Sequence, residues 1–305
     1  MVRGVPQGSI LGPLLYILYT NDFAKAFPHN QTILYADDTA VVYEHKNTAP
    51  LIQQIDSSVA AIEEWFTENS LSLNLNKTNL IKFGSYGDFP SKITLTNGDC
   101  VALKDCVKLL GLHIDKDLKW NSHIEHVSNK INKYIYMIRS INRIVPPAIL
   151  LNIYHGFVES NLRFCLIFWG SSTKTVDLFK TQKRSLRAIE NVSTRQSCRP
   201  IFRKHGLLTI YDLYILECAV FVKNNPTLFG RNVSAHEHNT RTKRNYVLNQ
   251  AQVNVGATNK MLKVFNKLPH RVKELPLKKF KKEIKNYLQN NNFYGINEYF
   301  NKPYW

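Results

Sequence analysis

The first third of the chain combines short apolar runs with one longer amphipathic segment. The short runs are rich in β-branched and aromatic side chains, which predicts strands. Two of them flank Asn97-Gly98, the preferred pair of a type I′ turn, so a β-hairpin is predicted there. The longer segment carries apolar residues at spacings of three and four, which predicts a helix. The predicted strands are residues 32–34, 39–43, 92–96, 100–103 and 106–114, and the predicted helix covers residues 50–69.

From about Trp120 onward the spacing of apolar residues is helical. One stripe runs from Ile124 to Ile141, and Pro146-Pro147 then ends that helix and opens the next. Helices bury such stripes against one another, so this part of the chain is predicted to form an all-α bundle. In the last predicted helix the apolar residues lie on one side and lysines surround the other. Further helices are predicted over residues 174–190, 207–223 and 277–288, and a loop over residues 224–256.

Two adjacent carboxylates, Asp37 and Asp38, fall between the first two predicted strands, where the chain must turn. Like charges side by side repel each other, and a bound divalent cation would convert that repulsion into attraction. The alternative is a hydrophilic hairpin tip, because Asp is common in turns. Upstream, the glycines and prolines of residues 3–13 mark a rigid turn with close backbone approach, and Pro13 would open an apolar helix.

Two motifs in this region occur together in one known family. Pro-Gln-Gly-Ser at residues 6–9, followed downstream by Tyr-Ala-Asp-Asp at residues 35–38, resembles the palm motifs of reverse transcriptases of non-LTR retrotransposons and group II introns. Further segments follow in the order of the jockey-like, insect-type elements, so that the resemblance covers nearly the whole chain. Residues 71–78 are similar to the next palm motif, 107–112 to the primer grip, 118–124 to the segment leading into the thumb, and 265–269 with the following basic helix to the end of the reading frame.

The resemblance implies RNA-templated DNA synthesis in which two Mg²⁺ ions, or Mn²⁺ in their place, activate a primer 3′-hydroxyl. It implies an RNA template, a DNA primer and deoxynucleoside triphosphates as partners, with Asp37 as the principal metal ligand and Asp38 as the weaker one. The other implied roles belong to Gln7 at the template, Gly8 and Ser9 at the template and incoming nucleotide, Tyr35 beneath the primer end, Lys77 near the nucleotide phosphates, and Leu110 and Gly111 in the primer grip.

One part of the family's pattern has no counterpart in this sequence. In the family, a carboxylate from an earlier palm strand bridges the two ions, and neither that strand nor the fingers occurs between Met1 and the Pro-Gln-Gly-Ser motif. We therefore expect a C-terminal fragment of the enzyme that is inactive by itself and has the missing N-terminal segment as a partner. The alternatives are a non-catalytic, nucleic-acid-binding remnant, or an intron maturase, which would carry a different domain after the thumb.

Charge divides the chain in the same way as the apolar pattern. Its 305 residues have a formal net charge of +17, but residues 1–130 hold 11 Lys and Arg against 14 Asp and Glu, whereas residues 131–305 hold 29 against 9. The strongly basic half suits a phosphate backbone; a membrane surface or nuclear targeting are the alternatives. The basic residues off the apolar stripes, predicted to face a nucleic-acid backbone, are Lys130, Lys133, Arg139, Arg143, Lys183, Arg184, Arg187, Lys278, Lys279, Lys281 and Lys282.

Composition places the chain among intracellular globular proteins. A hydrophobic content of 44% is enough to build a core, and five cysteines without a CxxC pair argue against a disulfide framework or a zinc knuckle. The sequence has neither a long uncharged apolar run nor a signal peptide, so we expect a nuclear protein or a cytoplasmic ribonucleoprotein, neither membrane-bound nor secreted. The predicted α+β architecture is a truncated polymerase palm, with an antiparallel sheet, over residues 1–115, a thumb-like helical region over 116–223 and a basic helical C-terminal extension over 224–305.

Overall fold

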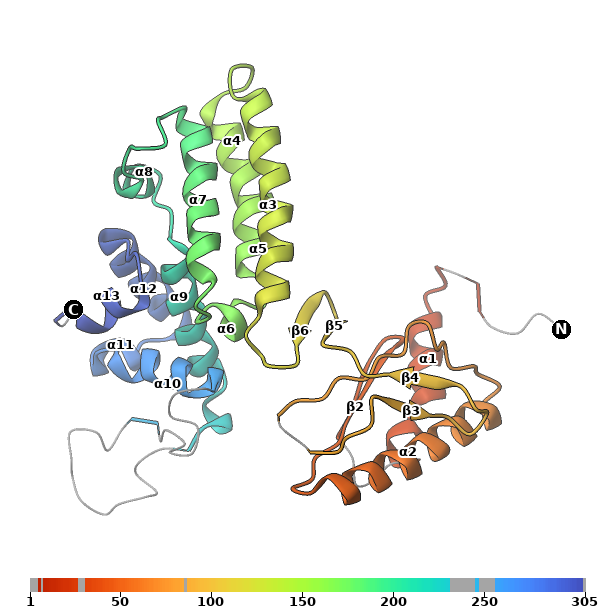
Figure 1. The fold of residues 1–305 in the computed structure, drawn as a ribbon. Helices are drawn as coiled ribbons and strands as arrows, with labels where there is room; N and C mark the ends of the chain where they lie inside the picture. The colour runs from red at the N-terminus through yellow and green to blue at the C-terminus, as the bar shows by residue number, and fades with distance from the viewer. Residues whose placement is uncertain are drawn as a thin grey trace, which may run out of the picture. The chain divides into compact units, whose positions relative to one another are not determined.

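The computed structural model describes residues 5–6, 8–26, 31–84, 87–230, 245–246 and 256–303; Gln7 therefore lies outside the described residues. The chain forms two compact units, Met1–Leu118 and Lys119–Trp305 (Figure 1). The elements of the first unit are α1 Gly12–Thr20, the 3-10 helix η1 Phe23–Ala26, β1 Gln31–Tyr35, β2 Asp38–Val42, α2 Thr48–Glu68, β3 Lys92–Thr94, β4 Cys100–Ala102, β5 Cys106–Leu109 and β6 Leu112–Asp115.

Helix α2 organises the small core of the first unit, and it confirms the helix predicted over residues 50–69. Near its end, Trp65 packs edge-on against Phe23 of η1, with the ring centroids 4.9 Å apart. Near its start, Leu51 and Ile55 pack with Ile93 of β3 in a second buried cluster. The spacing of these residues along α2 is the three-and-four pattern of an amphipathic helix.

The described strands form three separate two-stranded antiparallel sheets, β1-β2, β3-β4 and β5-β6, and not the single sheet that was predicted. The predicted strand 106–114 is itself a hairpin, because Leu110 and Gly111 adopt φ values of 46° and 88° and reverse the chain. The hairpin predicted at Asn97-Gly98 is present, but only Gly98 of that pair has a positive φ, of 87°. A three-residue loop with a glycine bulge thus replaces the type I′ turn.

The second unit is built from helices, consistent with the change of apolar period after Trp120. Fully buried side chains from helices far apart in sequence form its core, among them Trp169, Tyr154, Tyr214 and Phe280. Its elements are α3 Asn121–Ile141, α4 Pro147–Ile153, the π-helix η2 Tyr154–Glu159, α5 Ser160–Arg163, α6 Leu166–Trp169, α7 Thr175–Glu190, α8 Arg199–Lys204, α9 Ile210–Asn224, the 3-10 helix η3 Pro226–Leu228, α10 Ala257–Lys267, α11 His270–Lys273, α12 Leu277–Asn291 and α13 Ile296–Asn301.

Helix α9 is the centre of the second unit, since α6, α7, α10 and α12 all contact it. The described helices of the predicted C-terminal extension therefore share one core with the predicted thumb-like region. A buried polar link joins the two: Asp212 of α9 accepts hydrogen bonds from the backbone N–H of Thr209 at 3.1 Å and of Phe293 at 3.2 Å. Among the described helices, none has the length and apolar character required to span a membrane.

Candidate functional site

The acidic pair lies at the tip of the β1-β2 hairpin. Tyr35 pairs with Asp38 across the strands, so Ala36 and Asp37 alone form the connecting loop. Both carboxylates are exposed to solvent. In a paired strand, residues directly opposite each other place their side chains on the same face, so Asp38 lies beside Tyr35 while Asp37 occupies the turn itself. The two carboxylates thus have different surroundings although they are adjacent in sequence.

The turn holds one residue in an unfavourable backbone conformation. Ala36 has φ of 50°, in the left-handed region that residues with a Cβ atom seldom occupy. Such a conformation costs about 1 kcal/mol or more for a residue other than glycine. Two-residue hairpin loops require positive φ at one or both positions, so the tight turn, and with it the position of the carboxylates, imposes the cost.

Helix α1 brings the upstream segment next to the hairpin tip. Burial raises the pKa of the Tyr16 phenol on α1, and the nearby negative charge of Asp37 raises it further. Before α1, Gly8 has φ of 88° and Ser9 donates its backbone N–H to Pro6 at 3.1 Å, which forms the tight turn predicted from the glycines and prolines. The structure therefore places the region of Gly8 and Ser9, through α1, on the same unit as Asp37.

The described residues provide the hairpin with two carboxylates and no more. Within them, no group of three or more His, Cys, Asp or Glu side chains gathers at one point. Lys77 is exposed in a turn that begins at Asn74, and among the described residues its side chain forms no hydrogen bond or ion pair with Asp37 or Asp38. Mg²⁺ typically binds to one or two carboxylates and keeps several water ligands, so the pair fits one such ion.

The two residues predicted for the primer grip lie at the tip of the β5-β6 hairpin. Leu110 and Gly111 form its two-residue loop, and both Leu109 and Leu110 are exposed. A non-glycine residue with φ of 46° at Leu110 is unfavourable in the same way as Ala36 in the first hairpin. Two hairpin turns with left-handed residues therefore carry the candidate metal ligands and the candidate primer grip.

Sequence reasoning missed an extended exposed apolar surface of the first unit, which we call the α1 face. It comprises two residues before α1 and six on it, and each is more than a third exposed. Helices in folded proteins normally bury an apolar stripe, so a helix that exposes its apolar side chains all round lacks a partner in this structure. The run of apolar residues after Pro13 was visible in the sequence, but its exposure was not. The residues of the α1 face are Ile10, Leu11, Leu14, Leu15, Tyr16, Ile17, Leu18 and Tyr19.

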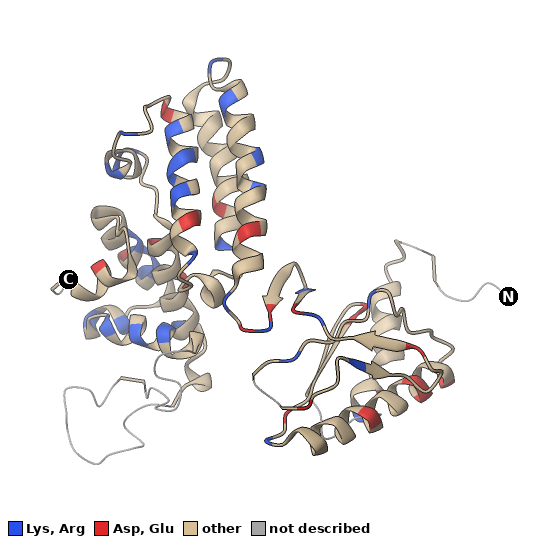
Figure 2. Ribbon diagram, in the orientation of Figure 1, with Lys and Arg blue, Asp and Glu red and all other residues tan. Residues whose placement is uncertain are grey.

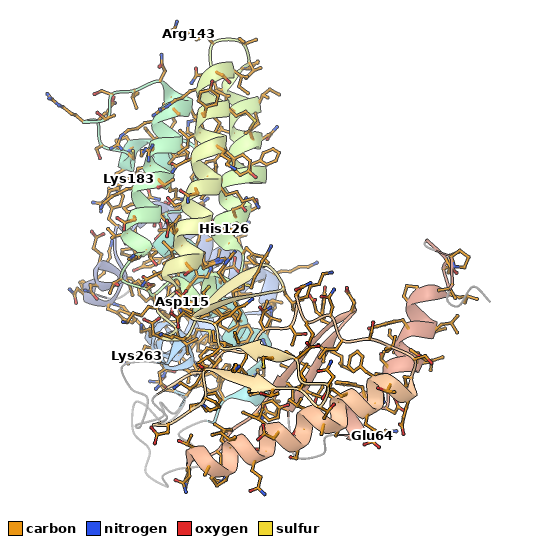
Figure 3. All side chains as sticks on the ribbon, turned by 45° about the vertical axis from the view of Figure 1, so that its right-hand side comes forward. Glu64, Asp115, His126, Arg143, Lys183 and Lys263 are labelled. Carbon is orange, nitrogen blue, oxygen red and sulfur yellow. The ribbon has the colours of Figure 1, made fainter. Side chains whose placement is uncertain are left out.

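The predicted nucleic-acid residues of the second unit lie on its helices, with Lys and Arg concentrated there as Figure 2 shows. Lys130, Lys133 and Arg139 lie on α3, Lys183, Arg184 and Arg187 on α7, and the four tail lysines on α12. Figure 3 shows Lys183 along α7 and Arg143 at the end of the unit where α3 stops. Lys278, Lys279, Lys281 and Lys282 are all exposed, while Phe280, Ile284 and Leu288 of the same helix are buried.

Comparison with known proteins agrees with the motifs. Residues 1–114 match the reverse transcriptase (RNA-dependent DNA polymerase) family. The chain is 25% identical over 178 residues, 56% of its length, to the probable RNA-directed DNA polymerase from transposon X-element of Drosophila melanogaster, and these residues make up 19% of that protein. It is 25% identical over 186 residues to the RNA-directed DNA polymerase from mobile element jockey of the same species, covering 57% of this chain and 20% of that protein.

A third relative, the probable RNA-directed DNA polymerase from transposon BS of Drosophila melanogaster, is 26% identical over 203 residues, which are 62% of this chain and 22% of that protein. The chain thus matches only about a fifth of the length of each of these relatives. No solved structure gives a significant match to this chain.

Proposed function

We propose, from the match of residues 1–114 to the reverse transcriptase family, that this chain is the C-terminal part of an RNA-directed DNA polymerase from a jockey-like non-LTR retrotransposon. In the intact protein the reaction is RNA-templated DNA synthesis. The observation that carries the proposal is the β1-β2 hairpin, which presents Asp37 and Asp38 at an exposed two-residue turn within the region that matches the family. The second unit is the counterpart of a thumb and a basic C-terminal extension.

In this proposal the hairpin carboxylates hold the metal. Asp37 in the turn is the principal ligand and Asp38 the weaker one, since its side chain lies on the face shared with Tyr35. When bound, Mg²⁺, or Mn²⁺ in its place, supplies a Lewis acid for the primer hydroxyl and the triphosphate. A pair of ions needs a further bridging carboxylate, and among the described residues no third acidic side chain lies beside the pair. We therefore expect the chain alone to be inactive.

The α1 face supports a protein partner that completes the polymerase domain. Its apolar residues lie on the helix that also places Tyr16 near Asp37. A segment that covered this face would bury apolar surface and approach the acidic tip at the same time. We assign this role to the N-terminal segment of the same reading frame.

The remaining site residues have proposed roles that follow from their positions. Gly8 and Ser9 form a tight turn, suited to close approach of the template and the incoming nucleotide. Gln7 lies outside the described residues, and its proposed role as a template contact comes from the family motif alone. Tyr35 flanks Asp38 beneath the primer end, and the exposed Lys77 contacts nucleotide phosphates. At the other hairpin tip, the primer grip consists of Leu110 and Gly111.

The basic helices of the second unit bind the template–primer backbone through Lys and Arg. A second candidate function, a non-catalytic nucleic-acid-binding remnant in a nuclear or cytoplasmic ribonucleoprotein, rests on the same helices and on the incomplete carboxylate set. The two candidates differ in whether the N-terminal segment restores chemistry.

Primer extension on poly(rA)/oligo(dT) tests the polymerase function. We expect the chain alone to give no extension with Mg²⁺ or Mn²⁺, and the N-terminal segment supplied in trans to restore it. Asp37→Ala should abolish the restored activity, whereas Asp22→Ala, which removes an exposed carboxylate outside the hairpin, should not. Extension by the chain alone that disappears in Asp37→Ala would mean that another carboxylate completes the site. Failure of every combination to extend the primer would favour the non-catalytic remnant.

A further inference from the structure

A cleft of about 390 Å³ lies at one end of the second unit, between the last turns of α3 and α7. The two helices run in the same direction, so their C-terminal ends lie side by side (Figure 1). Arg139 and Arg143 line the cleft from the end of α3, and Arg184 and Arg187 line it from α7. Two asparagines, Asn142 and Asn191, also line the cleft with Ala188, Val192 and Thr194, and the described residues around the cleft contribute no carboxylate. We call this site the arginine cleft.

The arginine cleft lies in a stretch of sequence almost free of acidic residues. Residues 126–158 and 178–211 contain a single carboxylate, Glu190. That carboxylate already has two partners. Its oxygens lie 2.7 Å from the ammonium nitrogen of Lys204 and 2.5 Å from Nε2 of His205. Within the described residues, none of the four cleft arginines forms an ion pair with a carboxylate. Their positive charges are therefore concentrated and available to an external anion.

The arginines are not needed to satisfy the helix ends. Cations near a helix C-terminus often interact with its last carbonyl groups, which would be a purely structural role. Here the side-chain amide of Asn142 already donates to the carbonyls of Ala188 and Ile189 near the end of α7. Only Arg187 is fixed in place, since its guanidinium donates to the carbonyl of Gln196 at 2.8 and 3.1 Å. Arg139, Arg143 and Arg184 remain exposed.

We propose that the arginine cleft is a discrete anchoring site for the phosphate backbone of nucleic acid. The proposal rests on the proposed function and adds to it that a built pocket, and not the lysine-rich surface of α12, provides most of the affinity of the second unit. A guanidinium presents a rigid fork that can donate two parallel hydrogen bonds to one phosphate, whereas the ammonium of lysine is a mobile point charge. Four such groups in one cleft favour successive phosphates over a single small anion.

Within the second unit, the cleft lies at the end of α3, and the 21 residues of this helix extend for about 30 Å. We expect the arginines to act on the affinity for the nucleic acid and on how long it stays bound.

Fluorescence anisotropy of the full chain with a labelled RNA–DNA hybrid tests the proposal. In Arg139→Gln/Arg143→Gln/Arg184→Gln, three charges are removed, and the slope of log K against log salt should become about 2 to 3 units shallower. The matched control, Lys278→Gln/Lys279→Gln/Lys281→Gln, removes three exposed charges from α12 and should weaken binding far less. The triple substitution of the same arginines to lysine keeps every charge, yet should lower affinity about tenfold or more, because the forks are lost.

Four results would overturn the inference. The first is an equal loss of affinity in the cleft variant and in the α12 variant. The second is wild-type affinity in the arginine-to-lysine variant. Either result would indicate a diffuse electrostatic surface. The third is binding of the wild-type chain to phosphatidylserine vesicles but not to the hybrid, which would also remove the proposed nucleic-acid role of the second unit. If the hybrid binds and the first two results appear, the proposed function stands and only the arginine cleft fails. Inorganic phosphate that displaces the hybrid completely at low concentration would likewise exclude a backbone site.

Discussion

Replacement of Asp212 by asparagine should change how the stability of the second unit depends on pH. The Asp212 side chain is completely buried, and this burial raises its pKa from 3.8 to about 7, against the opposing effect of the hydrogen bonds from Thr209 and Phe293. Between these two pH values the folded state holds a proton that the unfolded state has lost. Folding therefore becomes less favourable as the pH rises from about 4 to about 7, and the difference corresponds to about 4 kcal/mol in total.

Asparagine cannot ionise, so the Asp212→Asn variant should lack this loss of stability. The NH2 group of the asparagine would replace one of the two acceptor oxygens and would face a backbone N–H donor. The lost hydrogen bond should lower the stability of the folded state by about 1–3 kcal/mol at every pH. The variant should thus be less stable than the wild type near pH 4 and as stable or more stable near pH 7. Urea unfolding followed by helical circular dichroism across this range measures the effect, with Asp177→Asn, an exposed site on α7, as the control. Identical pH dependence in the wild type and in Asp212→Asn would refute the reasoning.

Two further substitutions examine backbone geometry. Ala36→Gly should stabilise the first hairpin by about 1 kcal/mol, since glycine adopts the φ of 50° without strain; amide hydrogen exchange in β1 and β2 measures this, and faster exchange would count against it. Gly170→Ala should destabilise the second unit by about 3 kcal/mol in urea unfolding, because the added methyl group would collide with the buried ring of Tyr214. An unchanged midpoint would show that the ring moves aside easily.

Local features of the fold could be predicted from the sequence, whereas features that join distant residues could not. The helix around Trp65 and the hairpin around Asp37 depend on short-range periodicity and turn chemistry. The separation of the hairpins into three sheets depends on which strand edges meet, and alternating residues do not encode that. The turn at Leu110 was missed because leucine seldom adopts a positive φ, so the residue gave no signal of a reversal.

The candidate site shows the same limit. The acidic pair was found because both carboxylates are adjacent in sequence, and the individual arginines were found because they lie off the apolar stripes. Their assembly into a cleft was not predictable, since Arg143 follows α3 whereas Arg184 lies on α7, far away in sequence. The central place of α9 had a readable signal: residues 210–222 are apolar on nearly all sides, which is typical of a helix buried on every face.

The two units differ in the side chains that they expose, and the proposed contacts of each unit should therefore respond differently to salt. The first unit exposes the apolar α1 face beside the acidic hairpin, whereas the second unit buries its aromatic core completely and exposes cationic side chains. Burial of apolar surface is little affected by salt, but phosphate binding weakens steeply as salt increases. The proposed association with an N-terminal segment through the α1 face should therefore persist at ionic strengths that release nucleic acid from the proposed site in the arginine cleft. We therefore expect the polymerase activity of the reconstituted protein to fall as salt increases, while the two protein segments stay associated.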